Sequence, residues 1–163
     1  MKLGLIAAAA ALIAICGCGD PAATDGKIVS ISYALKVNGR QVDTASGDRP
    51  FVFTMGDKST IPGMEEALKN KHKGDKIHIL IPPEKAYGAH NGAYVKEVPL
   101  SALKGLQVKA GDNIAARTAD GKALPAKIIA LGKTAATVDF NHPLAGQTLE
   151  FDLTVLDVRN SRR

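Results

Sequence analysis

The sequence carries the pattern of a β-sheet that stops before its last strand. Alternating hydrophobic residues and turn signals run from Pro50 to Gly88, but the strand needed to close the sheet follows only at Leu149, Phe151 and Leu153. About fifty residues lie in between, whereas neighbouring elements of a compact domain are usually joined by short connections. The spacing therefore predicts a domain that is interrupted by a separate inserted unit.

The size and charge of the chain limit its possible functions. Its 163 residues suit one domain with a small insertion. The formal net charge is +5, from 21 Lys and Arg and 16 Asp and Glu that are scattered along the chain. A groove for nucleic acid usually combines a basic stripe with stacking aromatic residues, and this chain has only 3 Tyr, 4 Phe and no Trp. We therefore expect no nucleic acid among its partners.

The first residues have the features of an export signal. Lys2 precedes the apolar run Leu3–Ile15, which is too short to span a bilayer comfortably but fits the core of a signal peptide. The segment Ile15–Cys18 resembles a bacterial lipobox, in which a small residue precedes the acceptor cysteine. This resemblance implies a lipoprotein signal peptide over residues 1–17, cleavage before Cys18 and lipidation of its thiol. The protein would then be exported and lipid-anchored to a bacterial membrane, facing the periplasm.

The cysteines leave other interpretations open. A plain secretory peptide would make both cysteines incidental, and a disulfide between Cys16 and Cys18 is disfavoured because only one residue separates them. Cys16 is the poorer lipidation site, since Ile15 stands where a small residue is required. No cysteine follows Cys18 in the sequence, so the folded domain is expected to depend on its hydrophobic core.

The segment after the signal alternates between hydrophobic and polar residues as β-strands do. Residues 18–26 are expected to form a short flexible tether. A half-buried strand is predicted over residues 28–37, followed by a hairpin turn at Asn38–Gly39, where positive φ is tolerated. The other elements expected in this part are strands at 41–43, from Pro50 and at 77–81, and a short helix whose buried stripe is Met64, Ala67 and Leu68.

Residues 89–139 differ in character, with Tyr94 as their only aromatic residue. Asp120–Gly121 is a good hairpin turn. We expect a small β-rich unit with its own local contacts. In the closing strand the hydrophobic residues change faces near Val155, which predicts a bulge. Within the inserted unit, short alternating runs predict strands at 113–118, 126–131 and 135–138.

A series of motifs extends in order over nearly all of the mature chain. They are Tyr33, Val42–Asp43, Pro50–Phe51, Gly56, Ile61–Glu65, Ala86–Gly88 and Phe151. In this order they resemble the FK506-binding-protein (FKBP) family of peptidyl-prolyl cis-trans isomerases, and Asn141–Gly146 after an insertion resembles its SlyD-like branch. The resemblance implies an α+β fold, an antiparallel sheet wrapped on a short helix. It divides the chain into an isomerase domain (27–88 and 140–159) and a chaperone-like insert-in-flap domain (89–139).

The resemblance also implies an enzyme that needs no cofactor and no metal. Rotation about an X-Pro bond faces a barrier of about 18–20 kcal/mol, because the planar amide is stabilised by resonance. A dry apolar pocket favours the twisted amide, which carries less charge separation than the planar ground state. The residues that the resemblance assigns to the pocket are Tyr33, Asp43, Phe51, Ile61, Met64, Tyr87 and Phe151, with Val42 and Thr60 binding substrate at the rim.

Individual roles follow from the same resemblance. The Ile61 N–H would hold a substrate carbonyl beyond the proline, and the Tyr87 hydroxyl would donate to a second carbonyl. Asp43 would orient the peptide and hydrogen-bond Tyr33, without acting as a base, since the rotation transfers no proton. Taken alone, the same residues have simpler explanations: Phe51 and Tyr33 would be ordinary core residues of a sheet, and Asp43 would cap a loop.

Departures from the family pattern affect the expected ligands. Met64 stands where many relatives have a Trp, and Val42 replaces a frequent Phe, so only weak binding of an FK506-type ligand is expected. The histidines lack the spacing of metal ligands, and an incidental surface site stays open. His142 is best explained as part of the turn after the insertion. The histidines concerned are His72, His78, His90 and His142.

Two functions are compatible with the sequence. The first is a prolyl isomerase that assists the folding of exported proteins, with the insertion binding unfolded, proline-containing polypeptides. The alternative is a non-catalytic holdase chaperone with vestigial isomerase activity. Exposed apolar side chains on the insertion would favour chaperoning. The candidates are Tyr94, Val95, Val98, Leu100, Leu103 and Leu106.

Overall fold

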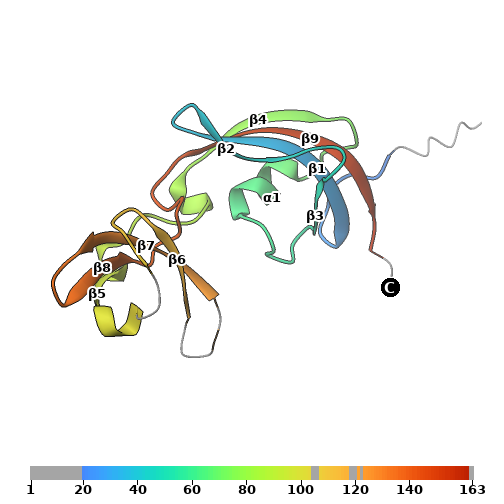
Figure 1. Ribbon diagram of the computed structural model, residues 1–163. Coiled ribbons are helices and arrows are strands. Elements are labelled where there is room, and N and C mark those ends of the chain that lie inside the picture. The colour runs from blue at the N-terminus through green and yellow to red at the C-terminus, as the bar shows by residue number, and fades with distance from the viewer. Residues whose placement is uncertain (1–19, 104–106, 118–120, 122, 162–163) are drawn as a thin grey trace, which may run out of the picture.

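A computed structural model of the protein describes residues 20–161, apart from 104–106, 118–120 and 122 (Figure 1). The predicted signal peptide and Cys18 lie outside the described residues, as do Leu106 and Asp120. Within the described part of the chain, no helix is long and apolar enough to cross a membrane.

The described chain forms two antiparallel sheets (Figure 1). The main sheet has the order β2-β1-β9-β4, with β3 also paired to β1, and the second sheet has the order β5-β8-β7-β6. The strands of the main sheet are β1 (Lys27–Val37), β2 (Arg40–Ala45), β3 (Phe51–Thr54), β4 (Lys76–Ile81) and β9 (Leu149–Asn160). Those of the second are β5 (Val95–Pro99), β6 (Asn113–Arg117), β7 (Ala123–Leu131) and β8 (Ala135–Asp139). The helical elements are α1 (Pro62–Leu68) and three 3₁₀ turns, η1 (Pro83–Lys85), η2 (Gly92–Tyr94) and η3 (Leu100–Leu103).

The strand after the insertion occupies the middle of the main sheet. β9 pairs with β1 along ten residue pairs, from Lys27↔Asn160 to Lys36↔Glu150, and with β4 on its other side. The part of the chain before residue 89 therefore contains β4 but not β9, the strand with which β4 pairs. The four strands of the second sheet all lie between β4 and β9 in the sequence. Below, the main domain means residues 20–88 and 140–161, and the insert means residues 89–139.

The main sheet curves over α1, and the core lies between them (Figure 1). Alternation along β1 buries Val29, Ile31 and Leu35, as its pattern predicts, and α1 contributes Met64 and Leu68. Ala67, the third residue of the predicted helical stripe, is only half-buried.

The start of α1 fits closely against the main sheet. A Cβ built on Gly63 would lie 2.4 Å from Cγ2 of Ile81 and 3.1 Å from the carbonyl oxygen of Lys85. Glycine is therefore required where α1 meets the end of β4.

Two irregularities of the strands agree with the sequence. Asn38 and Gly39 turn β1 into β2 with φ values of 50° and 74°, which suits a two-residue hairpin. Ser30 pairs with Asp157 and Ile31 with Val155, so Leu156 has no partner on β1 and forms a bulge. The buried residues of β9 change from Val155 to Val158 across it, as the change of faces near Val155 predicts.

The segment predicted to be a flexible tether is in part anchored. Ala23 is completely buried in the main core. Its N–H donates to the Lys71 carbonyl at 2.7 Å, and its carbonyl accepts from the Asn70 N–H at 2.8 Å. Because these bonds pair the segment with the loop after α1, the folded domain begins before residue 27. The sequence pattern missed this because a single small apolar residue gives no periodic signal.

The insert has its own small core. Ile128 and Val138 are fully buried between β7 and β8, with Ala126, Ala136 and Leu103 around them. The three predicted strands are present, although β7 begins at Ala123 rather than at residue 126. β5 was missed by the sequence pattern, because Lys96 and Glu97 interrupt the alternation of its hydrophobic residues.

Candidate active site

A cavity of about 470 Å³ opens between α1 and the concave face of the main sheet. Eight of the nine residues that the sequence assigns to catalysis and substrate binding line this cavity. Ser59 and Leu35 also line it and were not predicted, since nothing in a serine of a polar loop or a buried strand leucine marks a pocket. The lining residues are Tyr33, Leu35, Asp43, Phe51, Ser59, Thr60, Ile61, Met64, Tyr87 and Phe151.

Three strands bring an aromatic wall together. Tyr33 comes from β1, Phe51 from β3 and Phe151 from β9. The ring of Tyr33 lies edge-on to both phenylalanines, with centroids 6.2 Å from Phe51 and 5.6 Å from Phe151. Edge-to-face pairs at these distances are favourable because of the ring quadrupoles. The wall is therefore rigid and apolar, and it depends on the pairing of β9 with β1 across the insertion.

A hydrogen bond joins the two polar groups of the wall. The Tyr33 hydroxyl donates to Oδ2 of Asp43 at 2.6 Å, and Oδ1 of Asp43 accepts the Thr44 N–H at 2.8 Å. Burial, followed by the hydrogen bond and charge of Asp43, raises the pKa of Tyr33 far above its ordinary value. Tyr33 therefore keeps its proton. The expected contact between Asp43 and Tyr33 is confirmed.

The floor of the cavity is built at the start of α1. Met64 is 3% exposed, and the Thr60 hydroxyl contacts its sulfur at 3.3 Å. Ile61 caps the helix with extended backbone, φ −70° and ψ 142°, and its carbonyl accepts the N–H groups of Met64 and Glu65. The Ile61 N–H makes no hydrogen bond to another described residue, since the first N–H groups of a helix have no partner inside it.

Tyr87 has a neighbour that sequence reasoning missed. The imidazole of His142 stacks on the Tyr87 ring, with centroids 3.6 Å apart and an angle of 10° between the planes. His142 also accepts the Leu144 N–H in the predicted turn. Burial, and then the charge of Asp43, raises the pKa of Tyr87, and burial lowers the pKa of His142. A residue that follows the insert in the sequence thus stacks on a side chain that lines the cavity.

Val42 is the one predicted site residue that does not line the cavity. Its side chain is 50% exposed and lines a neighbouring groove with Pro143, Leu144 and Gln147. Because side chains alternate along β2, Asp43 points to the cavity and Val42 does not. The predicted rim position of Val42 is therefore corrected to this adjoining groove.

One group of possible metal ligands exists among the described residues, formed by His78, Glu150 and Asp152. Lys36 already supplies a cation there, with Nζ 2.9 Å from Asp152 and 3.8 Å from Glu150. Hydrogen bonds from His78 and Lys36 lower the pKa of Asp152. Ion pairing with Lys36 therefore explains why these side chains gather on the outer face of the sheet.

Comparison with known proteins places this geometry in a family. The sequence profile of the FKBP-type peptidyl-prolyl cis-trans isomerase family matches residues 19–156. The chain is 36% identical over 132 residues to a probable FKBP-type 16 kDa peptidyl-prolyl cis-trans isomerase of Pseudomonas fluorescens, covering 80% of this chain and 88% of that protein. It is 35% identical over 133 residues to the FKBP-type isomerase SlyD of Aeromonas hydrophila, covering 81% of this chain and 62% of that protein.

A solved structure shows the same likeness. The crystal structure of FkpA from Escherichia coli matches with a TM-score of 0.50 and 25% sequence identity, over 88% of this chain and 45% of that chain. The α+β fold expected from the sequence is thereby confirmed. The family profile includes both parts of the main domain and the insert between them, and the SlyD-like relatives agree with the predicted branch. The chain therefore belongs to the FKBP-type peptidyl-prolyl cis-trans isomerases, enzymes that interconvert the cis and trans forms of X-Pro peptide bonds.

Proposed function

We propose that this isomerase assists the folding of exported proteins, with the cavity under the main sheet twisting X-Pro bonds and the insert binding unfolded chain. The observation that supports the catalytic part is the convergence of eight predicted residues on one apolar cavity. The rotation needs neither a nucleophile nor a metal. It needs a surface that binds the twisted amide better than the planar one.

The proposed mechanism uses solvent exclusion and two hydrogen-bond donors. Phe51, Phe151 and Met64 surround the proline ring and exclude water, which favours the less polar twisted amide. The Ile61 N–H and the Tyr87 hydroxyl donate to substrate carbonyls and hold the chain in the twisted form. Tyr87 keeps its proton at neutral pH because burial and the charge of Asp43 raise its pKa. Each 1.4 kcal/mol of selective stabilisation gives about a tenfold acceleration.

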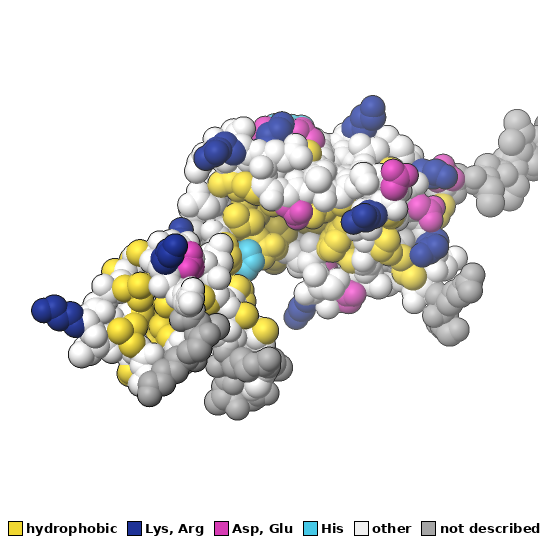
Figure 2. Space-filling model, in the orientation of Figure 1, with side chains coloured by type: hydrophobic (Ala, Val, Ile, Leu, Met, Phe, Trp, Pro, Cys, Tyr) yellow, Lys and Arg dark blue, Asp and Glu magenta, His cyan; other side chains and the backbone are white. Residues whose placement is uncertain are grey.

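The proposal that the insert binds unfolded chain is supported by its exposed apolar residues. Figure 2 shows hydrophobic side chains in the hollow under the main sheet and over the insert. Tyr94 is 54% exposed, and Ile129 and Leu131 on β7 are 47% and 42% exposed. Of the other candidates from the sequence, Leu103 is buried, whereas Val95, Val98 and Leu100 are half-buried.

The same exposed residues favour the alternative function, a holdase with vestigial catalysis, so the two must be separated by experiment. We propose measuring cis/trans exchange of a short X-Pro peptide and the refolding of a protein limited by proline isomerisation. Both are measured with the full mature chain and with residues 89–139 replaced by a short Gly-Ser link. The isomerase proposal expects both proteins to accelerate peptide exchange and only the full chain to accelerate refolding strongly. Peptide exchange at the uncatalysed rate with the full chain would favour the holdase.

The assignment of the donors is tested by Tyr87→Phe combined with Asp43→Ala. The double variant loses one donor and a carboxylate that lines the same cavity. Peptide exchange is therefore expected to fall by about tenfold, the equivalent of one or two hydrogen bonds. The Val42→Ala variant is the matched control, because Val42 lies outside the cavity. Full activity of the double variant would refute the site assignment.

The membrane location and the binding of macrocyclic ligands are further parts of the proposal. We propose that Cys18 carries a lipid anchor, and Cys18→Ala should then move the protein from the membrane to the soluble fraction. Persistent membrane association of this variant would contradict lipidation. Weak binding of an FK506-type ligand is proposed because Met64 forms a flexible aliphatic floor, and titration of FK506 into the protein measures it.

A further inference from the structure

The insert is attached to the main domain by two chain crossings that lie side by side. The outgoing crossing contains Gly88 to Tyr94, and the returning crossing contains Asp139 to Gly146. Backbone hydrogen bonds join them at both ends, from the Gly146 N–H to the Gly88 carbonyl at 2.8 Å and from the Phe140 N–H to the Tyr94 carbonyl at 3.0 Å. The crossings therefore form one joint rather than two independent linkers.

Asn141 lies at the centre of this joint. Asn141 is the one polar or charged residue that is buried in the described part of the chain, and its exposed fraction is 9%. Its Oδ1 accepts the Asn91 N–H at 2.9 Å, and its Nδ2 donates to the Asn91 carbonyl at 3.0 Å. One side-chain amide on the returning crossing thus satisfies both backbone groups of a residue on the outgoing crossing, as a neighbouring strand would do.

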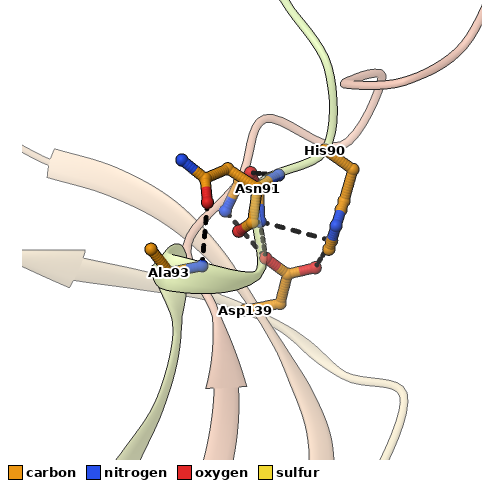
Figure 3. A network of polar contacts seen from close by, with 5 residues as sticks. His90, Asn91, Ala93 and Asp139 are labelled. Atoms are coloured by element: carbon orange, nitrogen blue, oxygen red, sulfur yellow. Dashed lines mark hydrogen bonds and ion pairs between the residues drawn. The ribbon is translucent and has the colours of Figure 1, made fainter.

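The amide is held in place by a second set of contacts (Figure 3). Asp139 Oδ1 accepts both the Asn141 N–H at 2.8 Å and its Nδ2 at 2.7 Å, while Oδ2 lies 2.8 Å from Nε2 of His90. Burial opposes the ionisation of Asp139, but hydrogen bonds from Asn141 and His90 keep its pKa below the ordinary value. Gly146 fits against His90 without room to spare, since a Cβ there would lie 3.3 Å from His90 Cβ. The joint is closely packed and fully hydrogen-bonded at Asn141.

The joint connects the insert directly to the mouth of the cavity. On one side of Asn141, Asp139 ends β8 of the insert. On the other side, His142 stacks on Tyr87, which lines the cavity. A groove of about 390 Å³ runs beside the joint and is lined by Ile129 and Pro125 from the insert and by His142 and Gln147 from the main domain.

We propose that Asn141 is a positioning residue that fixes the orientation of the insert relative to the isomerase cavity, so that a chain held by the insert reaches the cavity. The part of this inference that concerns substrates rests on the proposed function of the insert. The orientation itself does not, because it follows from the contacts of Asn141 alone. Loss of the amide removes the two hydrogen bonds that Asn141 makes to the Asn91 backbone across the crossings, and its Nδ2 bond to Asp139 within the returning crossing. It leaves the residues of the cavity in place.

The experiment compares the full mature chain with Asn141→Ala and Asn141→Asp. Residual dipolar couplings of backbone amides report the orientation of the insert, and exchange of a short X-Pro peptide and refolding of a proline-limited protein report activity. Both variants are expected to lose the shared alignment of the two sheets. The catalytic efficiency for the protein substrate should fall about tenfold, mainly through a higher KM, while that for the peptide changes less than about twofold, the tenfold loss being the equivalent of about 1.4 kcal/mol.

The matched control is Asn91→Ala. Among the described residues, the Asn91 side chain makes one hydrogen bond, from the Ala93 N–H of η2 to its Oδ1. This variant therefore removes an amide from the joint without separating the crossings, and both readouts should stay at the level of the unchanged protein. Unchanged couplings in the Asn141 variants would overturn the proposal, and so would equal losses for peptide and protein. If Asn141→Ala does not fold, Asn141→Asp carries the test, because its carboxylate still accepts the Asn91 N–H but donates nothing. Altered couplings with unchanged refolding would instead show that the insert does not deliver substrate, which contradicts the proposed function and leaves the orienting role standing.

Discussion

The main domain and the insert use the same antiparallel pairing to bury very different interiors. The main core contains Phe53, Phe151 and two methionines between a curved sheet and α1. The described core of the insert is smaller and contains two alanines, Ala126 and Ala136, with no helix longer than a 3₁₀ turn to cover it. Burial of apolar area supplies most of the stability of a fold. The main domain can therefore hold a rigid cavity, whereas the insert has less to lose by opening.

The difference between the two cores bears on which unit suits catalysis and which suits the proposed binding of unfolded chain. A pocket that favours a twisted amide needs walls that do not move. Two of the three strands of its aromatic wall, β1 and β9, share the longest pairing among the described strands. A surface for unfolded chains of varied sequence needs exposed apolar residues. The insert exposes Tyr94, Ile129 and Leu131, and the main domain also exposes Val42, Val52 and Leu80. The larger core thus lies in the main domain, whereas exposed apolar residues lie in both units.

The comparison is tested most strongly by removing one core side chain from each unit. Leu153→Ala and Ile128→Ala each delete a side chain that is almost fully buried, which costs about 2–5 kcal/mol in such positions. We expect Leu153→Ala to lower the free energy of unfolding of the whole protein and Ile128→Ala to open the insert alone. Amide hydrogen exchange in β1 and β8 measures the two effects separately. Equal loss of protection in β1 from Ile128→Ala would show that the two cores unfold as one.

A glycine in each unit sharpens the comparison of packing. Gly63→Ala places a Cβ against Ile81 and the Lys85 carbonyl, and such overpacking costs about 1–3 kcal/mol. Gly92→Ala in the insert meets nothing within 4 Å, so its effect should lie within about 0.5 kcal/mol. Urea unfolding followed by tyrosine fluorescence gives both values. A larger loss from Gly92→Ala than from Gly63→Ala would reverse the proposed difference in packing.

The polar contact of the cavity wall is expected to have a smaller effect. Tyr33→Phe removes the hydroxyl that donates to Asp43 at 2.6 Å, and the free energy of unfolding of the main domain should fall by about 1 kcal/mol, as for a partly exposed hydrogen bond. Hydrogen exchange in the insert should not change. Asp43→Asn is the control, because it keeps an acceptor for the same hydroxyl. An equal loss of stability in both variants would mean that the charge of Asp43, and not the hydrogen bond, stabilises the wall.

The smallest expected effect is a pH dependence at the border between the two units. Burial lowers the pKa of His142, so the folded state prefers the neutral imidazole. This contribution to stability is complete above the unfolded pKa of about 6.5 and is lost as the pH falls through it towards the lower folded pKa. His142→Phe keeps an aromatic ring on Tyr87 and cannot titrate, so its stability relative to the unchanged protein should rise between pH 7 and pH 5. A constant difference over this range would contradict the shift.

Much of the main domain could be predicted because its signals are local. The alternation of β1, the turn at Asn38–Gly39 and the change of faces near Val155 all follow from a period of two and from the positive φ that Asn and Gly tolerate. β5 and the anchoring of Ala23 could not be found in this way, because neither segment has a regular hydrophobic pattern. Tertiary partners, and not local preference, decide their conformation.

The candidate site likewise contains residues that the sequence identified and residues that it did not. The ordered motifs identified Tyr33, Asp43 and Tyr87, which line the cavity. The family resemblance placed Val42 at the rim, but Val42 and Asp43 are adjacent on β2, and adjacent residues of a strand face opposite sides. The stacking of His142 on Tyr87 could not be predicted, since fifty-four residues lie between them in the sequence and only the joint brings their rings together.

The sequence by itself determined the interruption of the fold, the order of the pocket residues and the chemistry that those residues permit, because periodicity and residue type are written along the chain. Only the tertiary structure decided that the returning crossing would lie against the outgoing one. The amide of Asn141 binds the Asn91 backbone there, and the next residue, His142, stacks on Tyr87 of the cavity. A hydrogen bond between segments fifty residues apart depends on the packing of both sheets, and no local pattern encodes it.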